Sequence, residues 1–184
     1  MILVVSFVAA AVLLVGHADP RPGRAPVPLT AAAAPYEMGE PAAPIDATGT
    51  ATLSNPTITT AKAAYGIAGQ WCSLLTAADV RAATGFDQRG LPDSTLVCTH
   101  YFADHDGRLF VSDIPAIQGA AHTVRGNTAI VYQSDPTSCE VSVALNRGGG
   151  LLDIDVRGVA SPRVPLCQAV VDLAGRAFDR LPAA

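Results

Sequence analysis

The stretch Trp71-Cys72-Ser73-Leu74-Leu75-Thr76-Ala77-Ala78-Asp79-Val80 marks the point at which the chain changes from a low-complexity segment to a folded domain. Thr76 and Asp79 have the three-residue spacing of a capping box, in which each side chain accepts a hydrogen bond from the other residue's backbone N–H. Gly85 is a suitable residue to end the helix that this box begins. The sequence therefore predicts a short helix over residues 77–84. The residues expected to be buried around it are Leu74, Leu75 and Val80.

Two segments precede this stretch, and we expect both to lie outside the folded domain. Residues 1–18 are mostly apolar and end in the small-x-small pattern Gly16-His17-Ala18, which is typical of a signal peptide or a short membrane anchor. Residues 19–65 are rich in Pro, Ala and Thr, a composition that favours a disordered linker. The threonines between residues 48 and 60 leave an O-glycosylated stalk as an alternative. Residues 66–184 are the predicted domain.

All four cysteines fall within this domain, and we interpret them as two disulfides in an oxidising compartment. Zinc sites bring cysteines in close pairs, which this sequence lacks. Two cysteines precede predicted helices and two lie on predicted strands. Of the three possible pairings, the most economical joins Cys72 to Cys167 and Cys98 to Cys139.

Between the two predicted helices the sequence alternates between apolar and polar residues, as expected of half-buried strands. The sequence Asp-Gly at residues 106–107 indicates a hairpin turn, and Gly126 indicates a bulge or a close backbone approach. Gly148-Gly149-Gly150 is interpreted as a turn, because a phosphate-binding loop would need a helix behind it and here a strand follows. The expected strands are residues 95–102, 108–114, 123–132, 139–146 and 152–157.

The last element is an amphipathic helix for which Pro165 supplies the first position. Its apolar face includes Cys167, and Asp172 and Arg176 on the polar face have the spacing of an ion pair. The predicted fold is therefore α+β: an antiparallel sheet of about five strands covered by a C-terminal helix and a short N-terminal helix, with two disulfides.

The polar residues do not indicate a catalytic, metal or cofactor site. The formal net charge of −4 argues against nucleic-acid binding. His17 lies in the leader and His105 in a turn, and neither His100 nor His122 accompanies a recognisable nucleophile motif. Asp104, His105 and Asp106 fit a solvated turn better than a metal site. Asp153 and Asp155 are expected on the solvated face of a strand.

Five sequence features, taken in order, resemble a family of exported actinobacterial cell-envelope proteins, many of them lipoproteins, known as domain of unknown function 3558. The resemblance covers residues 70–182. It implies an envelope-facing α+β domain and brings no catalytic residues, and residues 1–18 lack the lipobox cysteine of many relatives. The features are Cys72-Ser73-Leu74-Leu75-Thr76, Leu96-Val97-Cys98-Thr99-His100-Tyr101, Gly126-Asn127-Thr128-Ala129, Cys139-Glu140-Val141-Ser142-Val143 and Asp179-Arg180-Leu181-Pro182.

The sequence thus favours a secreted or membrane-tethered, extracytoplasmic protein that is not an enzyme. The leading hypothesis is a binding module for an envelope protein, a lipid or a glycan, with a ligand site that the sequence does not locate. It would contact the membrane only through the N-terminal apolar segment. An envelope hydrolase with an unrecognised site and a purely structural wall-associated spacer are the alternatives. A cleft that gathers a histidine, an acid and a hydroxyl would favour the hydrolase, and a sheet with an apolar pocket would favour binding.

Overall fold

The computed structural model describes residues 45, 47–63, 70–94, 97–103, 106–116, 118–159, 162 and 164–184. The expected leader, residues 19–44 of the expected linker, and the turn residues Asp104 and His105 lie outside the described residues. The described residues belong to one compact unit, residues 39–184.

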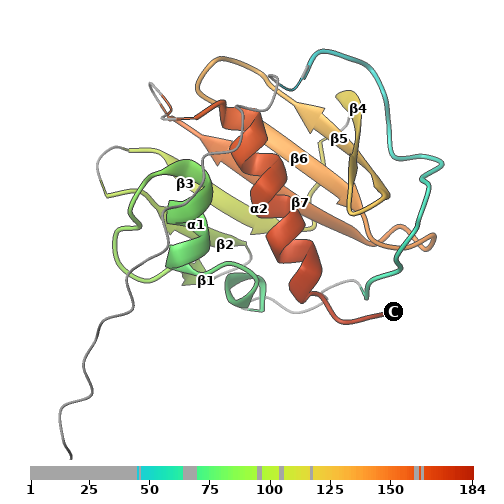
Figure 1. Cartoon of the computed structure of the whole chain (residues 1–184), viewed down its shortest axis with the longest axis horizontal. Coiled ribbons are helices and arrows are strands. Elements are labelled where there is room, and N and C mark those ends of the chain that lie inside the picture. The colour runs from blue at the N-terminus through green and yellow to red at the C-terminus, as the bar shows by residue number, and fades with distance from the viewer. Residues whose placement is uncertain are drawn as a thin grey trace, which may run out of the picture. The chain divides into compact units, whose positions relative to one another are not determined.

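An antiparallel sheet of seven strands and two α-helices form this unit (Figure 1). The strands follow the spatial order β1-β2-β3-β7-β6-β5-β4, and each neighbouring pair is antiparallel. The helices and the sheet confirm the predicted α+β class and the antiparallel pairing. The predicted number of disulfides, two, is also confirmed. The elements are the 3₁₀ helix η1 (Trp71–Ser73), α1 (Ala77–Thr84), β1 (Asp93–Ser94), β2 (Cys98–Tyr101), β3 (Arg108–Ser112), β4 (Ala120–Val124), β5 (Asn127–Tyr132), β6 (Cys139–Ala144), β7 (Leu151–Arg157) and α2 (Leu166–Arg180).

The strand count exceeds the prediction of about five. The segment predicted as a single strand over residues 123–132 is instead a hairpin of β4 and β5. Arg125 and Gly126 both have positive φ, 51° and 82°, as a tight turn of the primed type requires. The two-residue strand β1, which pairs with β2, was not predicted. The predicted turn at Gly148–Gly150 is confirmed, because it joins the paired strands β6 and β7.

Both helices cover the same face of the sheet, and the main core lies between them and the strands (Figure 1). Alternate residues of the central strands point into this core, among them Val141, Val143 and Ile154, which are fully buried. The predicted apolar face of α2 is buried, as are Leu74, Leu75 and Val80. The period of two along the strands and of 3.6 along α2 therefore produces one continuous apolar layer.

Helix α1 has the bounds and the capping box predicted for it. The Thr76 hydroxyl accepts from the Asp79 backbone N–H, and the Asp79 carboxylate accepts from the Thr76 N–H at 2.8 Å. The same carboxylate binds the Arg180 guanidinium of α2 at 2.7 and 3.0 Å, and these bonds hold the pKa of Asp79 below its usual range. The expected Asp172–Arg176 pair is not formed, because Arg176 turns toward Asp79 at 3.5 Å. One buried carboxylate therefore joins the two helices.

The described part of the expected linker is folded against the domain. The backbone of residues 57–63 lies along the start of β5 and the end of β6, and continues to the C-terminal end of α2 (Figure 1). Asn127 is fully buried, and its side-chain amide accepts from the N–H groups of Thr59 and Thr60 and donates to the carbonyls of Thr60 and Ala144. The predicted boundary at residue 66 is therefore corrected: we call residues 57–63 the N-terminal strap, and the strap belongs to the domain.

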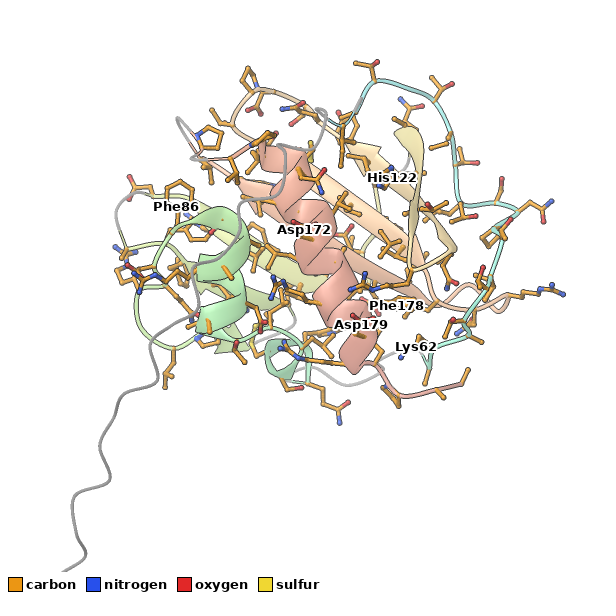
Figure 2. All side chains as sticks on the ribbon, viewed as in Figure 1. Lys62, Phe86, His122, Asp172, Phe178 and Asp179 are labelled. Atoms are coloured by element: carbon orange, nitrogen blue, oxygen red, sulfur yellow. A yellow bond between two sulfur atoms is a disulfide. The ribbon has the colours of Figure 1, made fainter. Side chains whose placement is uncertain are left out.

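The strap is also fixed at its end. The Lys62 ammonium donates to the Leu181 carbonyl at 2.7 Å and lies 5.3 Å from the centre of the Phe178 ring, beside the end of α2 in Figure 2. At its other end Thr59 packs against Gly126, where an added Cβ would approach the Thr59 hydroxyl to 2.9 Å. The close neighbour of Gly126 is thus the Thr59 side chain of the strap, and not the bulge or close backbone approach expected there.

The disulfides join Cys72 to Cys98 and Cys139 to Cys167, so the predicted pairing is wrong. Strands β3 and β7 lie between β2, which carries Cys98, and β6, which carries Cys139. Three strand spacings amount to about 14 Å, whereas bridged cysteines have Cα atoms less than about 7 Å apart. The observed bonds instead connect each helix start to the strand beside it, with Cα atoms 5.0 and 5.4 Å apart.

Candidate functional site

The face of the sheet opposite the helices carries a row of aromatic and acidic side chains. The strand register places Phe110 of β3 beside Asp155 of β7, Asp155 beside Glu140 of β6, and Glu140 beside Tyr132 of β5. Side chains of directly opposed residues lie on the same face and about 5 Å apart at Cβ. Two carboxyl groups are therefore flanked at both ends by an aromatic ring.

A second row, one step along the strands, is buried. It consists of Ser112, Asp153, Ser142 and Ile130, which follow one another through the register of the same four strands. The loop after β3 covers this row: the Ala116 N–H donates to the Ser142 hydroxyl at 2.9 Å, and the Ile114 N–H donates to the Ser112 hydroxyl at 3.2 Å. The loop thus encloses one side of the acidic row.

Between this loop and the acidic row lies a pocket of about 440 Å³. One wall is apolar and comes from the loop and the flanking rings, whereas the floor is polar and comes from β6 and β7. Concave sites with apolar walls and a few convergent polar groups are the usual form of small-ligand sites. The lining residues are Val97, Phe110, Ser112, Ile114, Pro115, Ala116, Gln118, Tyr132, Glu140, Asp153, Asp155 and Arg157.

Asp153 is the most deeply placed acid of the pocket, with 2% of its surface exposed. Burial, followed by the nearby negative charge of Glu140, raises the pKa of Asp153 to about 9. The carboxyl group therefore keeps its proton at neutral pH. It accepts a hydrogen bond from the Ser142 hydroxyl at 2.6 Å, and its own O–H donates a hydrogen bond to the Glu140 carboxylate. A chain of hydrogen bonds thus runs from the loop backbone through Ser142 and Asp153 to Glu140.

Glu140 lies at the open end of this chain and is half-buried. Burial, followed by the charge of Asp155, raises the pKa of Glu140, while the charge of Arg157 and the hydrogen bond with Asp153 lower it. Its carboxylate faces the pocket between Tyr132 and Asp155. Glu140 is therefore the acceptor that a bound molecule would meet first.

Asp155 is the third acid, and its charge is neutralised by Arg157. The Arg157 Nε donates to the Asp155 carboxylate at 2.6 Å, and the guanidinium lies 5.8 Å from the centre of the Phe110 ring. Asp155 is 6% exposed, and burial raises its pKa despite this partner. Asp155 is paired with Arg157 and Asp153 lies buried at the floor, so Glu140 is the half-buried acid that borders the open part of the pocket.

The prediction that Asp153 and Asp155 lie on a solvated strand face is wrong. Their alternation with apolar residues correctly placed them opposite the core, but the loop after β3 covers that face. Alternation identifies the two faces of a strand and does not identify what packs on them. The sequence signal available was the pair of aromatic residues Phe110 and Tyr132, which lie on the same face of the sheet as the acids. This signal becomes informative only once the strand order is known.

Neither His100 nor His122 lines the pocket. His100 is fully buried on the same face of β2 as Cys98, where its Nδ1 bonds the Gln88 side chain at 3.0 Å and its Nε2 lies 3.5 Å from the disulfide sulfur of Cys98. Burial lowers the pKa of His100 to about 4. His122 is half-buried on the edge strand β4 (Figure 2). His17 and His105 lie outside the described residues, so the cleft expected for a histidine-dependent hydrolase is not formed by His100 or His122.

Within the described residues, no group of three or more His, Cys, Asp or Glu side chains is arranged to hold a metal ion. In the same part of the chain, neither helix combines the length and the apolarity that crossing a bilayer would require. The two disulfides are consistent with an oxidising compartment.

Comparison of the chain with protein-family models, curated proteins and solved structures finds no match. The resemblance to the exported envelope family therefore stays a prediction.

Proposed function

We propose that this protein is an extracytoplasmic, non-catalytic binding module that holds a small ligand, or a small group of a larger one, in the pocket on the open face of its sheet. The observation that carries the proposal is the buried acid Asp153, bonded to the Ser142 hydroxyl at the floor of that pocket. A buried carboxyl group lowers stability relative to an apolar residue of similar size. Groups with strongly perturbed pKa values in a concave site are concentrated at functional sites.

The apolar wall supports binding more than it supports a structural spacer. At the rim of the pocket Ile114 is 67% exposed and Tyr132 is 38% exposed. The apolar core lies on the other face of the sheet, so these two side chains are not needed to form it. Exposed apolar groups around a polar floor are the arrangement expected where a ligand replaces water. A spacer requires neither the rim nor the buried acid.

The geometry gives less support to a hydrolase. Glycosidases use two carboxyl groups about 5 to 9.5 Å apart, so that the scissile bond or a water molecule fits between them. Glu140 and Asp153 instead share a hydrogen bond, which leaves no such space. Ser142 donates to Asp153 and accepts from a loop N–H, and no histidine lies beside it to act as a base within the described residues.

An extracytoplasmic location is supported by the use of all four cysteines in disulfides. Bonds of this kind form and persist in oxidising compartments. The resemblance to exported envelope proteins agrees with this proposal.

The test uses the oxidised full-length protein and a fraction of envelope extract containing molecules below about 1 kDa, the size range that pockets of this class accept. Native mass spectrometry of the mixture should show a bound species. Ala116→Phe, which fills the pocket from the loop, should remove that species. Ala121→Phe places the same ring on the same sheet face outside the pocket lining and should leave binding unchanged.

Two outcomes would contradict the proposal: no bound species with the unmodified protein, or equal binding by the two phenylalanine variants. If Ala116→Phe lowers the melting temperature, the exposed rim residue Gln118 offers a second way to block the pocket through Gln118→Trp.

A further inference from the structure

The pocket has a charge and a shape that select among ligand classes. We propose that it binds an alkylammonium group: a protonated amine on an apolar stem, with the amine at Glu140 and the stem against the loop wall. This inference rests on the proposed binding function and adds the chemistry of the ligand. The same group occurs on free amines and on lysine side chains.

The charge of the floor favours a cation. Of its three acids, Asp155 is paired with Arg157, and Asp153 is buried at the floor and bonded to Ser142, so that the pocket presents the carboxylate of the half-buried Glu140. The described cation of the lining, Arg157, is already bonded to Asp155 through both Nε and a terminal nitrogen. Glu140, Asp155 and Arg157 together carry one net negative charge, which a carboxylate or phosphate group of a ligand would increase and an ammonium would neutralise.

The donor pattern favours an ammonium over a neutral hydroxyl. Glu140 shares a hydrogen bond with Asp153 and lines the pocket, and a carboxylate has further acceptor positions for a ligand. An ammonium has three donors and no acceptor, which matches a site that offers carboxylate oxygens. The Tyr132 ring, directly opposite Glu140 in the register, adds an aromatic surface of the kind that attracts cations. A hydroxyl would satisfy the oxygens but would leave the charge uncompensated.

The wall accounts for the apolar stem. The loop after β3 covers one side of the pocket with Ile114, Pro115 and Ala116. Its backbone N–H groups bond the hydroxyls of Ser112 and Ser142, which fixes the loop to the sheet. Phe110 closes the other end of the row. An amine with a chain of several methylene groups would bury that chain against these residues while its charge stays at Glu140.

The test compares three probes with the same six-carbon stem: hexylammonium, hexanol and hexanoate, titrated at pH 7 by NMR into the oxidised full-length protein. The ammonium should bind about tenfold more tightly than the alcohol, as expected for a charge-assisted hydrogen bond, and hexanoate should bind most weakly. Glu140→Gln should reduce the preference for ammonium over alcohol to about twofold or less and leave the affinity for hexanol unchanged.

Asp172→Asn is the matched control. Asp172 is an exposed acid on α2, on the other side of the sheet, and its removal changes the net charge by the same amount. This variant should keep the full preference for ammonium. A peptide with one lysine, compared with hexylammonium, then distinguishes a polypeptide source of the group from a free amine.

The outcomes separate this inference from the proposed function. Equal binding of hexylammonium and hexanol, or an ammonium preference that survives in Glu140→Gln, overturns the ligand class while a ligand displaced by Ala116→Phe still supports the binding module. If none of the three probes binds and Ala116→Phe has no effect on the extract, both are wrong.

Discussion

Asp153 holds a proton at a pH at which an exposed aspartate has lost it. Its pKa is raised to about 9 by burial, whereas in the unfolded chain it returns to about 4. Between these two values the native state binds one more proton than the unfolded state, so the free energy of unfolding decreases as the pH rises. Burial also raises the pKa values of Glu140 and Asp155, which therefore act in the same direction.

The variant Asp153→Asn should remove a large part of this pH dependence. Asparagine can accept from Ser142 and donate to Glu140, as the protonated acid does, but it does not titrate. We expect the wild-type protein to lose up to about 1.4 kcal/mol per pH unit through Asp153 between pH 5 and 8. The variant should show a shallower slope and exceed the wild type in stability at pH 8.

Urea unfolding curves at several pH values measure this effect. Asp172→Asn, on the exposed face of α2, should keep the wild-type slope. Parallel stability profiles for Asp153→Asn and the wild type would show that Asp153 is ionised in the native state, contrary to the expectation.

Residues whose role is local could be predicted from the sequence, and Asp153 could not. Thr76 and Asp79 bond to each other across three residues, and Gly85 ends the helix with a positive φ of 76°, so helix α1 is specified within ten residues. The environment of Asp153 depends on a loop about 40 positions earlier in the chain that bonds to Ser142 on the neighbouring strand. No local pattern indicates that this loop turns back over the sheet.

At the scale of elements, the N-terminal strap shows how composition can mislead. Its threonines and the proline before them are typical of disordered segments. The Thr59 and Thr60 backbone groups are nevertheless bonded to one buried side chain, Asn127, whose four hydrogen-bonding positions are all used. Asn127 comes directly after the Arg125-Gly126 turn. The β4–β5 hairpin, which the sequence analysis predicted as one strand, therefore also positions the side-chain amide of Asn127.

The variant Asn127→Ala tests this role. It should leave the Thr59 and Thr60 N–H groups and two carbonyls without their partner, and we expect a loss of about 2–4 kcal/mol in the free energy of unfolding. Residues 57–63 should also exchange their amide hydrogens faster than the strands do, because the strap can detach before the sheet unfolds.

Hydrogen exchange followed by peptide mass spectrometry resolves the two effects. Thr123→Ala, at an exposed position of β4, is the control and should alter neither stability nor exchange in the strap. If exchange over residues 57–63 in Asn127→Ala stays as slow as in the wild type, the strap is held by its other contacts, including those of Lys62, and not by Asn127.

For the whole molecule, the lateral order of the strands determines the two features that the sequence did not predict, the disulfide pairing and the pocket. The alternation of residues predicted most of the strands, and the amphipathic pattern predicted α2. The strand β7 inserts between β3 and β6, however, and this crossover separates Cys98 from Cys139. The same crossover brings the acids of β6 and β7 between Phe110 and Tyr132. The disulfide pairing and the pocket were thus missed for one reason: both depend on the lateral order of strands, which periodicity along a strand does not encode.

The two disulfides close loops of similar length, with sequence separations of 26 and 28 residues. In the chain-entropy account, each stabilises the fold by about 3.5 kcal/mol, or about 7 kcal/mol together. Because small domains are stable by about 5 to 15 kcal/mol in total, the reduced protein should be close to unfolding at 37 °C. The double variants Cys72→Ala/Cys98→Ala and Cys139→Ala/Cys167→Ala should therefore lose similar amounts of stability, each well below the loss on full reduction. Urea unfolding of the oxidised protein, the reduced protein and the two double variants measures these losses.

Thiol titration of the denatured, unreduced wild type should find no free thiols, and peptide mapping should recover the two observed pairs. A reduced protein as stable as the oxidised one would show that the fold does not depend on an oxidising compartment, and the argument for an extracytoplasmic location would lose its structural support.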